Sequence, residues 1–137
     1  MSETASTVGV GVVLTSFGFK FGLPSDAEWT VDARMIRNPF WVPELRPHTG
    51  LDAPVREYVL GDPTARELID RVHALLLWSS QRSAERSLEA LNVAVGCTGG
   101  RHRSVAVVEA LGRDLREDGL AVTIHHRDVD QPDPRYE

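Results

Sequence analysis

One stretch, residues 91–115, constrains the fold of this chain more than any other. It reads LNVAVGCTGGRHRSVAVVEALGRDL. Residues 91–95 are apolar and rich in β-branched side chains, as in a buried strand. From Ser104 on, apolar side chains recur at the spacing of one helix face. The sequence therefore predicts a strand and a helix that are joined by a glycine-rich, basic loop.

This loop has the features of a phosphate cradle. Its backbone N–H groups and the positive end of the following helix dipole would converge on one place, which favours an anion. Glycines allow positive φ and leave room for a ligand. An arginine side chain can hold two phosphate oxygens at once. We therefore predict that eight loop residues bind the ligand: Cys97, Thr98, Gly99, Gly100, Arg101, His102, Arg103 and Ser104. His102 either faces the anion or begins the helix with a hydrogen bond to the backbone.

The same loop fits a second chemistry. Residues 97–104 match C-x-x-G-x-x-R-S, the loop of cysteine-dependent phosphatases. There Cys97 would attack phosphorus as a thiolate, Arg103 would clamp the other oxygens, and Asp32 would be the general acid. Those enzymes usually carry histidine before the cysteine, where this chain has Gly96. A lone cysteine at a strand end is more often a small buried residue, so we favour phosphate binding over catalysis.

The rest of the chain predicts one α/β domain over residues 1–137, with loose tails at 1–7 and 128–137. Strands are expected at 8–16, 29–33, 91–95 and 120–124, and helices at 53–60, from 63 and from 104. Residues 79–87 are polar enough to contain a helix end, and the proline-rich segment 38–50 is expected to be a loop. Alternating strands and helices indicate a mostly parallel sheet flanked by helices, whose ligands bind beyond the carboxyl ends of the strands.

Composition limits the classes of function. No apolar run approaches the roughly 20 residues that span a membrane, and the first residues lack the basic start of a signal peptide. We therefore expect a cytoplasmic protein without membrane contact. The single cysteine allows no internal disulfide, and adjacent His125 and His126 point to opposite faces of a strand, so we predict neither a metal site nor a cofactor. A net charge of -5 argues against a broad basic surface.

Asp32 and Arg34 lie at the end of the second predicted strand, on the same side of it. They either face the ligand pocket together or form a structural ion pair. The sequence leaves open whether the chain forms a homo-oligomer or binds a separate protein partner.

Three motifs carry a resemblance to a known family: SFGFKFGLPSDAEWTVDAR, NPFWVPELRPHTG and GCTGGRHRS. With their order and spacing, residues 16–124 resemble the C-terminal domain of the RNase adapter protein RapZ family. In that family the domain follows a P-loop NTPase domain, so this chain is expected to be a stand-alone version. The resemblance implies a phosphofructokinase-like fold, a regulatory role, contact with small RNA, and binding of an amino-sugar phosphate such as glucosamine-6-phosphate.

The resemblance also implies that Arg46 and Thr49 line the ligand site, although ordinary surface exposure would equally explain such residues. Two features depart from the family. Phe40 stands where the family's N-P-H-W motif has histidine, which removes a polar group near the sugar. The tail carries Asp128, Asp130 and Asp133 instead of a basic cluster. Because phosphate neutralisation supplies most of the affinity for RNA, we expect only weak RNA binding.

Overall fold

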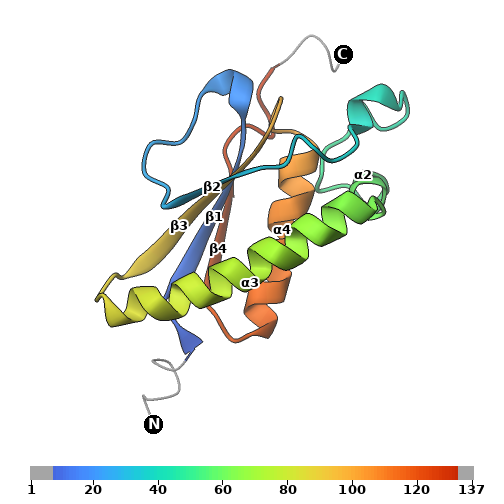
Figure 1. The fold of residues 1–137 in the computed structure, drawn as a ribbon. Coiled ribbons are helices and arrows are strands. Elements are labelled where there is room, and N and C mark those ends of the chain that lie inside the picture. The colour runs from blue at the N-terminus through green and yellow to red at the C-terminus, as the bar shows by residue number, and fades with distance from the viewer. Residues whose placement is uncertain (1–7, 133–137) are drawn as a thin grey trace.

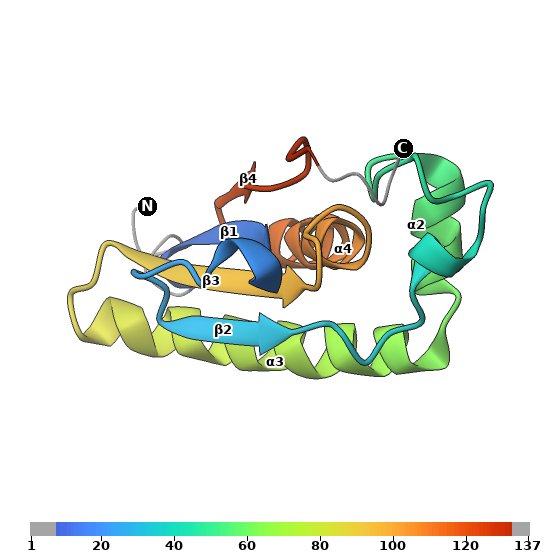
Figure 2. The ribbon, with the colours of Figure 1, turned by 90° about the horizontal axis from the view of Figure 1, so that it is seen from above.

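The computed structural model describes residues 8–132 and contains one sheet of four parallel strands in the order β2-β3-β1-β4. The strands are β1 (Gly11–Gly18), β2 (Trp29–Asp32), β3 (Ala90–Cys97) and β4 (Val122–His126). The helices are α2 (Ala53–Leu60), α3 (Pro63–Glu85) and α4 (Arg103–Glu117), with short 3-10 turns η1 (Phe19–Phe21) and η2 (Pro39–Trp41). Figure 2 shows β2 and β4 at opposite edges of this sheet. The predicted α/β fold with a parallel sheet is confirmed.

The chain order determines where the helices lie. The connections from β2 to β3 and from β3 to β4 step across the sheet in the same direction. Because parallel crossovers are right-handed, both connections place their helices on the same face. Accordingly α3 and α4 contact each other, and both contact β3. The carboxyl ends of the strands and the start of α4 meet at the top of Figure 1.

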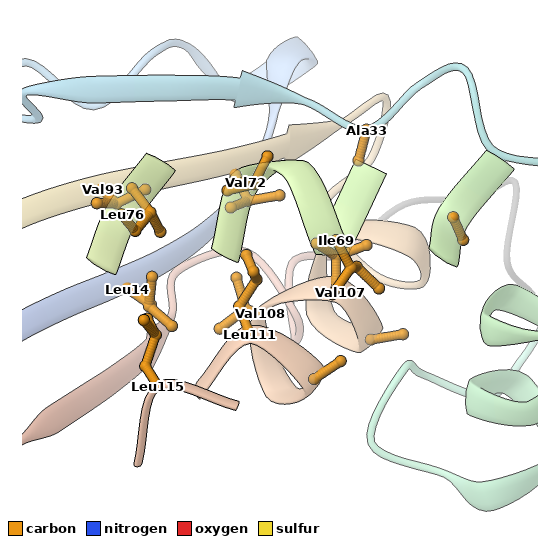
Figure 3. Packing of buried hydrophobic residues seen from close by; sticks show 14 of the residues in the cluster. Leu14, Ala33, Ile69, Val72, Leu76, Val93, Val107, Val108, Leu111 and Leu115 are labelled. Atoms are coloured by element: carbon orange, nitrogen blue, oxygen red, sulfur yellow. The ribbon is translucent and has the colours of Figure 1, made fainter. Parts of the chain in front are cut away.

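The core fills the space between this face and the two long helices. Leu14 of β1 and Val93 of β3 meet Leu76 of α3 and Leu111 of α4, all four with at most 1% of their surface exposed (Figure 3). Burying each such side chain contributes about 1.5–3 kcal/mol, so this layer fixes how α4 is oriented on the sheet. The start of α4 is thereby held beside the end of β3.

Helix α3 ends inside the polar run of residues 79–87, as the sequence predicts. Its last residue is Glu85, so most of this polar run is helical. Ser79, Ser80 and Ser83 are buried rather than exposed. The Ser80 hydroxyl donates to the carbonyl of Val10 at 2.5 Å. Small hydroxyl side chains can thus lie inside when a neighbouring segment supplies a hydrogen-bond partner.

Strand ends differ from the predictions by a few residues. Strand β1 begins and ends later than the expected 8–16, and β4 is shifted in the same way relative to 120–124. The helix predicted at 53–60 has the expected bounds, and Asp62 caps α3 by accepting from the backbone N–H of Thr64. Within residues 8–132, no helix is long and apolar enough to cross a membrane.

The segment after β4 is packed, not loose. Asp128 is only 2% exposed and accepts a 2.8 Å hydrogen bond from the backbone N–H of Gly18. Val129 is also buried. The expectation of a loose tail beginning at residue 128 is therefore wrong for these two residues. Its last part, 133–137, and the predicted loose segment 1–7 lie outside the described residues.

Candidate functional site

The loop between β3 and α4 is built by close backbone packing. Gly100 has a φ of 76°, the positive φ expected for a loop glycine. A Cβ on Gly100 would lie 2.4 Å from the backbone nitrogen of Gly18. Gly96 is needed for a different reason, because its Cβ would lie 2.5 Å from the ring of Phe17. The loop is thus folded tightly onto the end of β1.

This loop contains backbone donors that the protein does not use. Within residues 8–132, no group accepts a hydrogen bond from the backbone N–H of Thr98, Gly99 or Gly100. Native proteins rarely leave such donors without a partner, and consecutive N–H groups before a helix form an anion-binding concavity. Thr98 is exposed, whereas Gly99 and Gly100 are buried, so the N–H of Thr98 is the one of the three that belongs to an exposed residue.

Cys97 lies at the base of the loop. Its side chain is buried, with 2% of the residue exposed. The Sγ atom is 3.2 Å from the Ser104 hydroxyl and accepts from the Ser104 backbone N–H at 3.4 Å. Cys97 therefore joins the end of β3 to the first turn of α4, as a small buried residue at a strand end would do.

Arg103 is buried at 5% exposure and makes mainly structural contacts. Its Nη1 donates to the carbonyls of Arg34 at 2.8 Å and Ile36 at 3.0 Å. Its Nη2 lies 3.4 Å from the hydroxyl of Thr98. The Nη1 side of the guanidinium thus holds the turn after β2. Its Nη2 side lies against Thr98, so the positive charge of Arg103 is close to the 97–104 loop.

Arg101 joins the loop to two other segments. Its Nη2 donates to the carbonyl of Pro47 at 2.7 Å, and its Nη1 donates to the carbonyl of Val129 at 3.3 Å. The carbonyl of Arg101 in turn accepts from the backbone N–H of Gly50. The predicted binding residue Arg101 is therefore also the link between the proline-rich segment and the segment after β4.

His102 is a helix-start residue bonded to the backbone. Its ring Nε2 lies 3.0 Å from the carbonyl of Arg46, to which it donates in the matching tautomer. The side chain is buried, and this burial lowers the pKa of His102 to about 4 despite the hydrogen bonds to backbone carbonyls that favour the charged form. The nearby Arg101 and Arg103 lower it further. At neutral pH the ring therefore carries no charge.

Asp32 and Arg34 form a bidentate ion pair at the rim of the site. The Arg34 Nε and Nη2 donate to the two carboxylate oxygens at 3.0 and 2.9 Å. The guanidinium also lies 3.9 Å above the ring of Phe19. Hydrogen bonding from Arg34 is the main cause of the lowered pKa of Asp32. Both side chains are about half exposed, so the pair remains accessible beside the loop.

The proline-rich segment has a fixed path beside the loop. Arg46 donates from Nε to the carbonyl of Phe40 at 2.7 Å and lies over the Phe40 ring. The Thr49 hydroxyl accepts a hydrogen bond from the backbone N–H of Leu51. The backbone N–H of Thr49 donates to the carboxylate of Asp52. Both predicted wall residues therefore shape this segment, which His102 and Arg101 attach to the loop.

The carboxyl end of the sheet is the basic end of an acidic chain. The five residues after each strand contain five arginines or lysines and two aspartates, whereas the whole chain has a net charge of -5. The basic residues are Lys20, Arg34, Arg37, Arg101 and Arg127, and the acidic ones are Asp128 and Asp130. Such local asymmetry favours an anionic ligand at this end.

Sequence reasoning missed two residues that build the site. Gly18 lies under the loop, and its Cβ would be 2.4 Å from the carbonyl carbon of Gly99. A glycine at the end of an apolar strand was the available signal for close packing. The carboxylate of Asp128 accepts a hydrogen bond from the backbone N–H of Gly18. Aspartate is usually exposed, so the sequence predicted a loose tail here and gave no sign that Asp128 is buried.

Metal ligation has no geometric support in the described part of the chain. Among residues 8–132, no three His, Cys, Asp or Glu side chains are grouped so as to hold a metal ion. Two hollows of about 310 and 270 Å³ are lined by described residues, and both lie away from the 97–104 loop.

Comparisons with known proteins agree with this architecture. The family described as RapZ C-terminal domain matches residues 10–130. A nucleotide-binding protein of Frankia alni is 48% identical over 120 residues, which cover 88% of this chain and 42% of that protein. A nucleotide-binding protein of Mycobacteroides abscessus is 47% identical over 128 residues, which cover 93% of this chain and 42% of that protein. A nucleotide-binding protein of Anaeromyxobacter sp. is 45% identical over 122 residues, which cover 89% of this chain and 42% of that protein.

The chain thus spans about 42% of the length of these curated relatives. Since the match covers nearly all of the parallel sheet, its helices and the loop after β3, this chain belongs to the RapZ C-terminal domain family.

Proposed function

We propose that this chain is a regulatory binding module that holds the phosphate group of a small molecule in the 97–104 loop. The observation that carries the proposal is the run of backbone N–H groups at Thr98, Gly99 and Gly100, which donate to no acceptor within residues 8–132. They lie where α4 begins, at the positive end of its dipole. A phosphate oxygen bound at this helix start would be an acceptor for such donors.

Nearby side chains add charge to the backbone donors. Arg34 is half exposed at the rim and can turn spare donors toward an anion while Asp32 and Phe19 hold its plane. Arg103 contributes mainly as a fixed buried charge and as the group that positions Thr98. In this arrangement the backbone N–H groups would position the phosphate by hydrogen bonds, and the arginines would attract it by their positive charge.

The proposed ligand is a sugar phosphate, with glucosamine-6-phosphate as the first candidate. The curated relatives are named nucleotide-binding proteins, and those names describe chains more than twice as long as the matched segment. Phe40 lines the segment next to the loop and offers an apolar ring with Arg46 above it. A sugar ring that packs on this surface through its apolar face would compensate for a missing polar contact.

RNA is proposed only as a weak, salt-dependent partner. The described residues that follow β4 include Asp128 and Asp130, and Asp128 neutralises Arg127 at 2.8 Å. Few phosphates can therefore be neutralised there. In an anisotropy titration at near-physiological salt, we expect no tight complex; nanomolar affinity that persists as salt is raised would contradict this.

Phosphatase activity is the second candidate, and one observation favours it. The Ser104 hydroxyl and N–H both approach the Sγ of Cys97, as needed to stabilise a thiolate. Two observations weigh more heavily against it. Cys97 is 2% exposed, and the Nη1 of Arg103 is occupied by two carbonyls. A nucleophile must reach phosphorus, so we rank binding above catalysis.

Calorimetric titration with glucosamine-6-phosphate, glucosamine and inorganic phosphate tests the proposal. We expect the phosphorylated sugar to bind and plain glucosamine not to bind. Arg34→Gln and Arg103→Ala should each weaken binding by roughly ten- to a hundredfold, the scale of one charge-assisted hydrogen bond. Arg71→Gln, an exposed arginine on α3, is the matched control. Circular dichroism must show that Arg103→Ala, which removes a buried side chain, is still folded.

Two outcomes would contradict the proposal. One is equal affinity for glucosamine and its phosphate, which would mean that the phosphate group is not recognised. The other is unchanged affinity in both folded arginine variants, which would place the ligand away from this loop.

A further inference from the structure

A second basic site lies between α2 and α4. A hollow of about 310 Å³ opens there, at the lower limit of the sizes typical of small-molecule pockets. Its lining consists of Arg56, Leu60, Glu109, Ala110, Arg113 and Arg116. Three arginines and one glutamate surround it, so its charge is positive although the chain is acidic.

Two of the arginines are held in place by backbone carbonyls. Arg56 donates from Nη1 to the carbonyl of Leu51 at 3.0 Å, and Arg116 donates from Nη2 to the carbonyl of Val122 at 3.0 Å. A guanidinium carries five N–H donors, so each retains several for a ligand. Fixing the side chain in advance lowers the entropy lost on binding.

These positive charges are only partly neutralised by nearby carboxylates. Among the described residues, neither Arg56 nor Arg116 forms an ion pair, and Arg113 has only Asp114, at 3.9 Å. Glu109 is directed to another partner, because its Oε2 lies 2.8 Å from Nε2 of His126. Three guanidinium groups thus meet at one hollow, and two of them, Arg56 and Arg116, have no ion-pair partner among the described residues.

Placement at a helix end explains only part of this cluster. Arg116 lies in the last turn of α4, where a cation favours the helix dipole. Arg56 belongs to a different helix, and it faces the same hollow. At about 1.5 Å per residue, Arg113 lies roughly 15 Å along α4 from its start at Arg103. The hollow is therefore separate from the 97–104 loop.

We propose that this hollow binds a small molecule with a diphosphate or an equivalent pair of adjacent anionic groups. Guanidinium planes pair bidentately with phosphate oxygens, and three of them from two helices can surround adjacent phosphates. Leu60 and Ala110 supply an apolar floor for the remainder of the molecule. The ligand would bridge α2 and α4, which stabilises the packing of these two helices.

Titration of the 137-residue chain with inorganic pyrophosphate tests this site. We expect saturable binding that Arg113→Gln and Arg56→Gln each weaken about tenfold, the low end for one charged contact. Arg71→Gln, on the exposed surface of α3, should leave the affinity unchanged. Glu109→Gln removes the one carboxylate of the hollow and should raise the affinity.

The loop after β3 provides the internal comparison. Pyrophosphate binding that is lost in Gly100→Ala but unaffected by Arg113→Gln would assign pyrophosphate to the 97–104 loop and overturn this proposal. That outcome is independent of whether the loop also binds sugar phosphates. Binding of a single-stranded RNA oligonucleotide that depends on Arg113, without pyrophosphate binding, would also overturn it, because the surface would then recognise a polymer. Pyrophosphate binding that fails with Arg113→Gln and persists in Gly100→Ala supports it.

Discussion

Gly100 and Gly18 pack backbone against backbone at the carboxyl ends of β3 and β1. A Cβ on Gly100 would lie 2.4 Å from the nitrogen of Gly18, and a Cβ on Gly18 would lie 2.8 Å from the nitrogen of Gly100. That same nitrogen of Gly18 donates to the buried carboxylate of Asp128. The 97–104 loop, the end of β1 and the segment after β4 are therefore joined at one point.

This contact predicts different effects for two glycines that both have positive φ. Gly22 has a φ of 93° and a ψ of 150°, and a Cβ added there would meet no atom within 4 Å, so Gly22→Ala should cost only the backbone strain, about 1–3 kcal/mol of unfolding free energy. Gly100→Ala adds a steric clash, for a total of roughly 2–5 kcal/mol. Only Gly100→Ala should weaken binding of the sugar phosphate. Urea unfolding and calorimetry on both variants measure this, and equal losses would contradict the role of the contact.

Asp128 should make folding sensitive to acid. Burial opposes its ionisation most strongly, but the hydrogen bonds from Arg127 and from the Gly18 N–H outweigh this and lower the pKa of Asp128 below its usual 3.8. A lowered folded pKa means that the stabilisation is present above about pH 4 and is lost as the pH falls through the folded value. Asp128→Asn should cost about 1.5–3 kcal/mol at pH 7.

Urea unfolding at pH 7 and pH 3 measures this effect. The wild type and Asp128→Asn should differ at pH 7 and converge at low pH. Asp130→Asn changes an exposed aspartate two residues further on and is the control. Its unfolding free energy should equal that of the wild type at both pH values. A constant difference between wild type and Asp128→Asn at all pH values would refute the electrostatic explanation.

His102 should contribute a second pH dependence at a higher range. Its pKa is lowered to about 4 by burial, whereas the ordinary value is 6.5. Between these values the unfolded chain binds a proton that the folded chain rejects, so stability falls as the pH drops from 6.5 to about 4. The loss attributable to this residue is on the order of 3 kcal/mol. His102→Gln keeps a donor for the Arg46 carbonyl without a titrating group, and should flatten the unfolding free energy across this range.

Cys97 tests whether the loop is catalytic. We expect turnover of an aryl phosphate near background, because the Sγ is buried against Ser104. Cys97→Ser should leave anion binding largely intact, since the donors belong to the backbone of Thr98, Gly99 and Gly100. Robust turnover that disappears in Cys97→Ser would instead establish the phosphatase alternative.

Local patterns were sufficient to predict most of the helices and strands and the glycine-rich loop between β3 and α4. Apolar periodicity located β3 and α4, and Asp62 followed by Pro63 marked the start of α3. These signals are local because hydrogen bonds and side-chain spacing within one element involve residues close in sequence. The glycine-rich loop at 97–104 could therefore be identified, and its position at the carboxyl end of a parallel strand followed from the fold class.

What each polar side chain does was decided only by the tertiary structure. Arg103 donates to Arg34, 69 residues away in sequence, and Gly18 donates to Asp128, 110 residues away. No local pattern indicates that a distant carbonyl will occupy a guanidinium or that an aspartate near the C-terminus will be buried. The sequence determined the strand, loop and helix because their periodicity is intrinsic to each segment. The partners of Arg101, Arg103 and Asp128 depended on which segments the parallel sheet brings together, and a buried charge must satisfy its donors wherever folding places them.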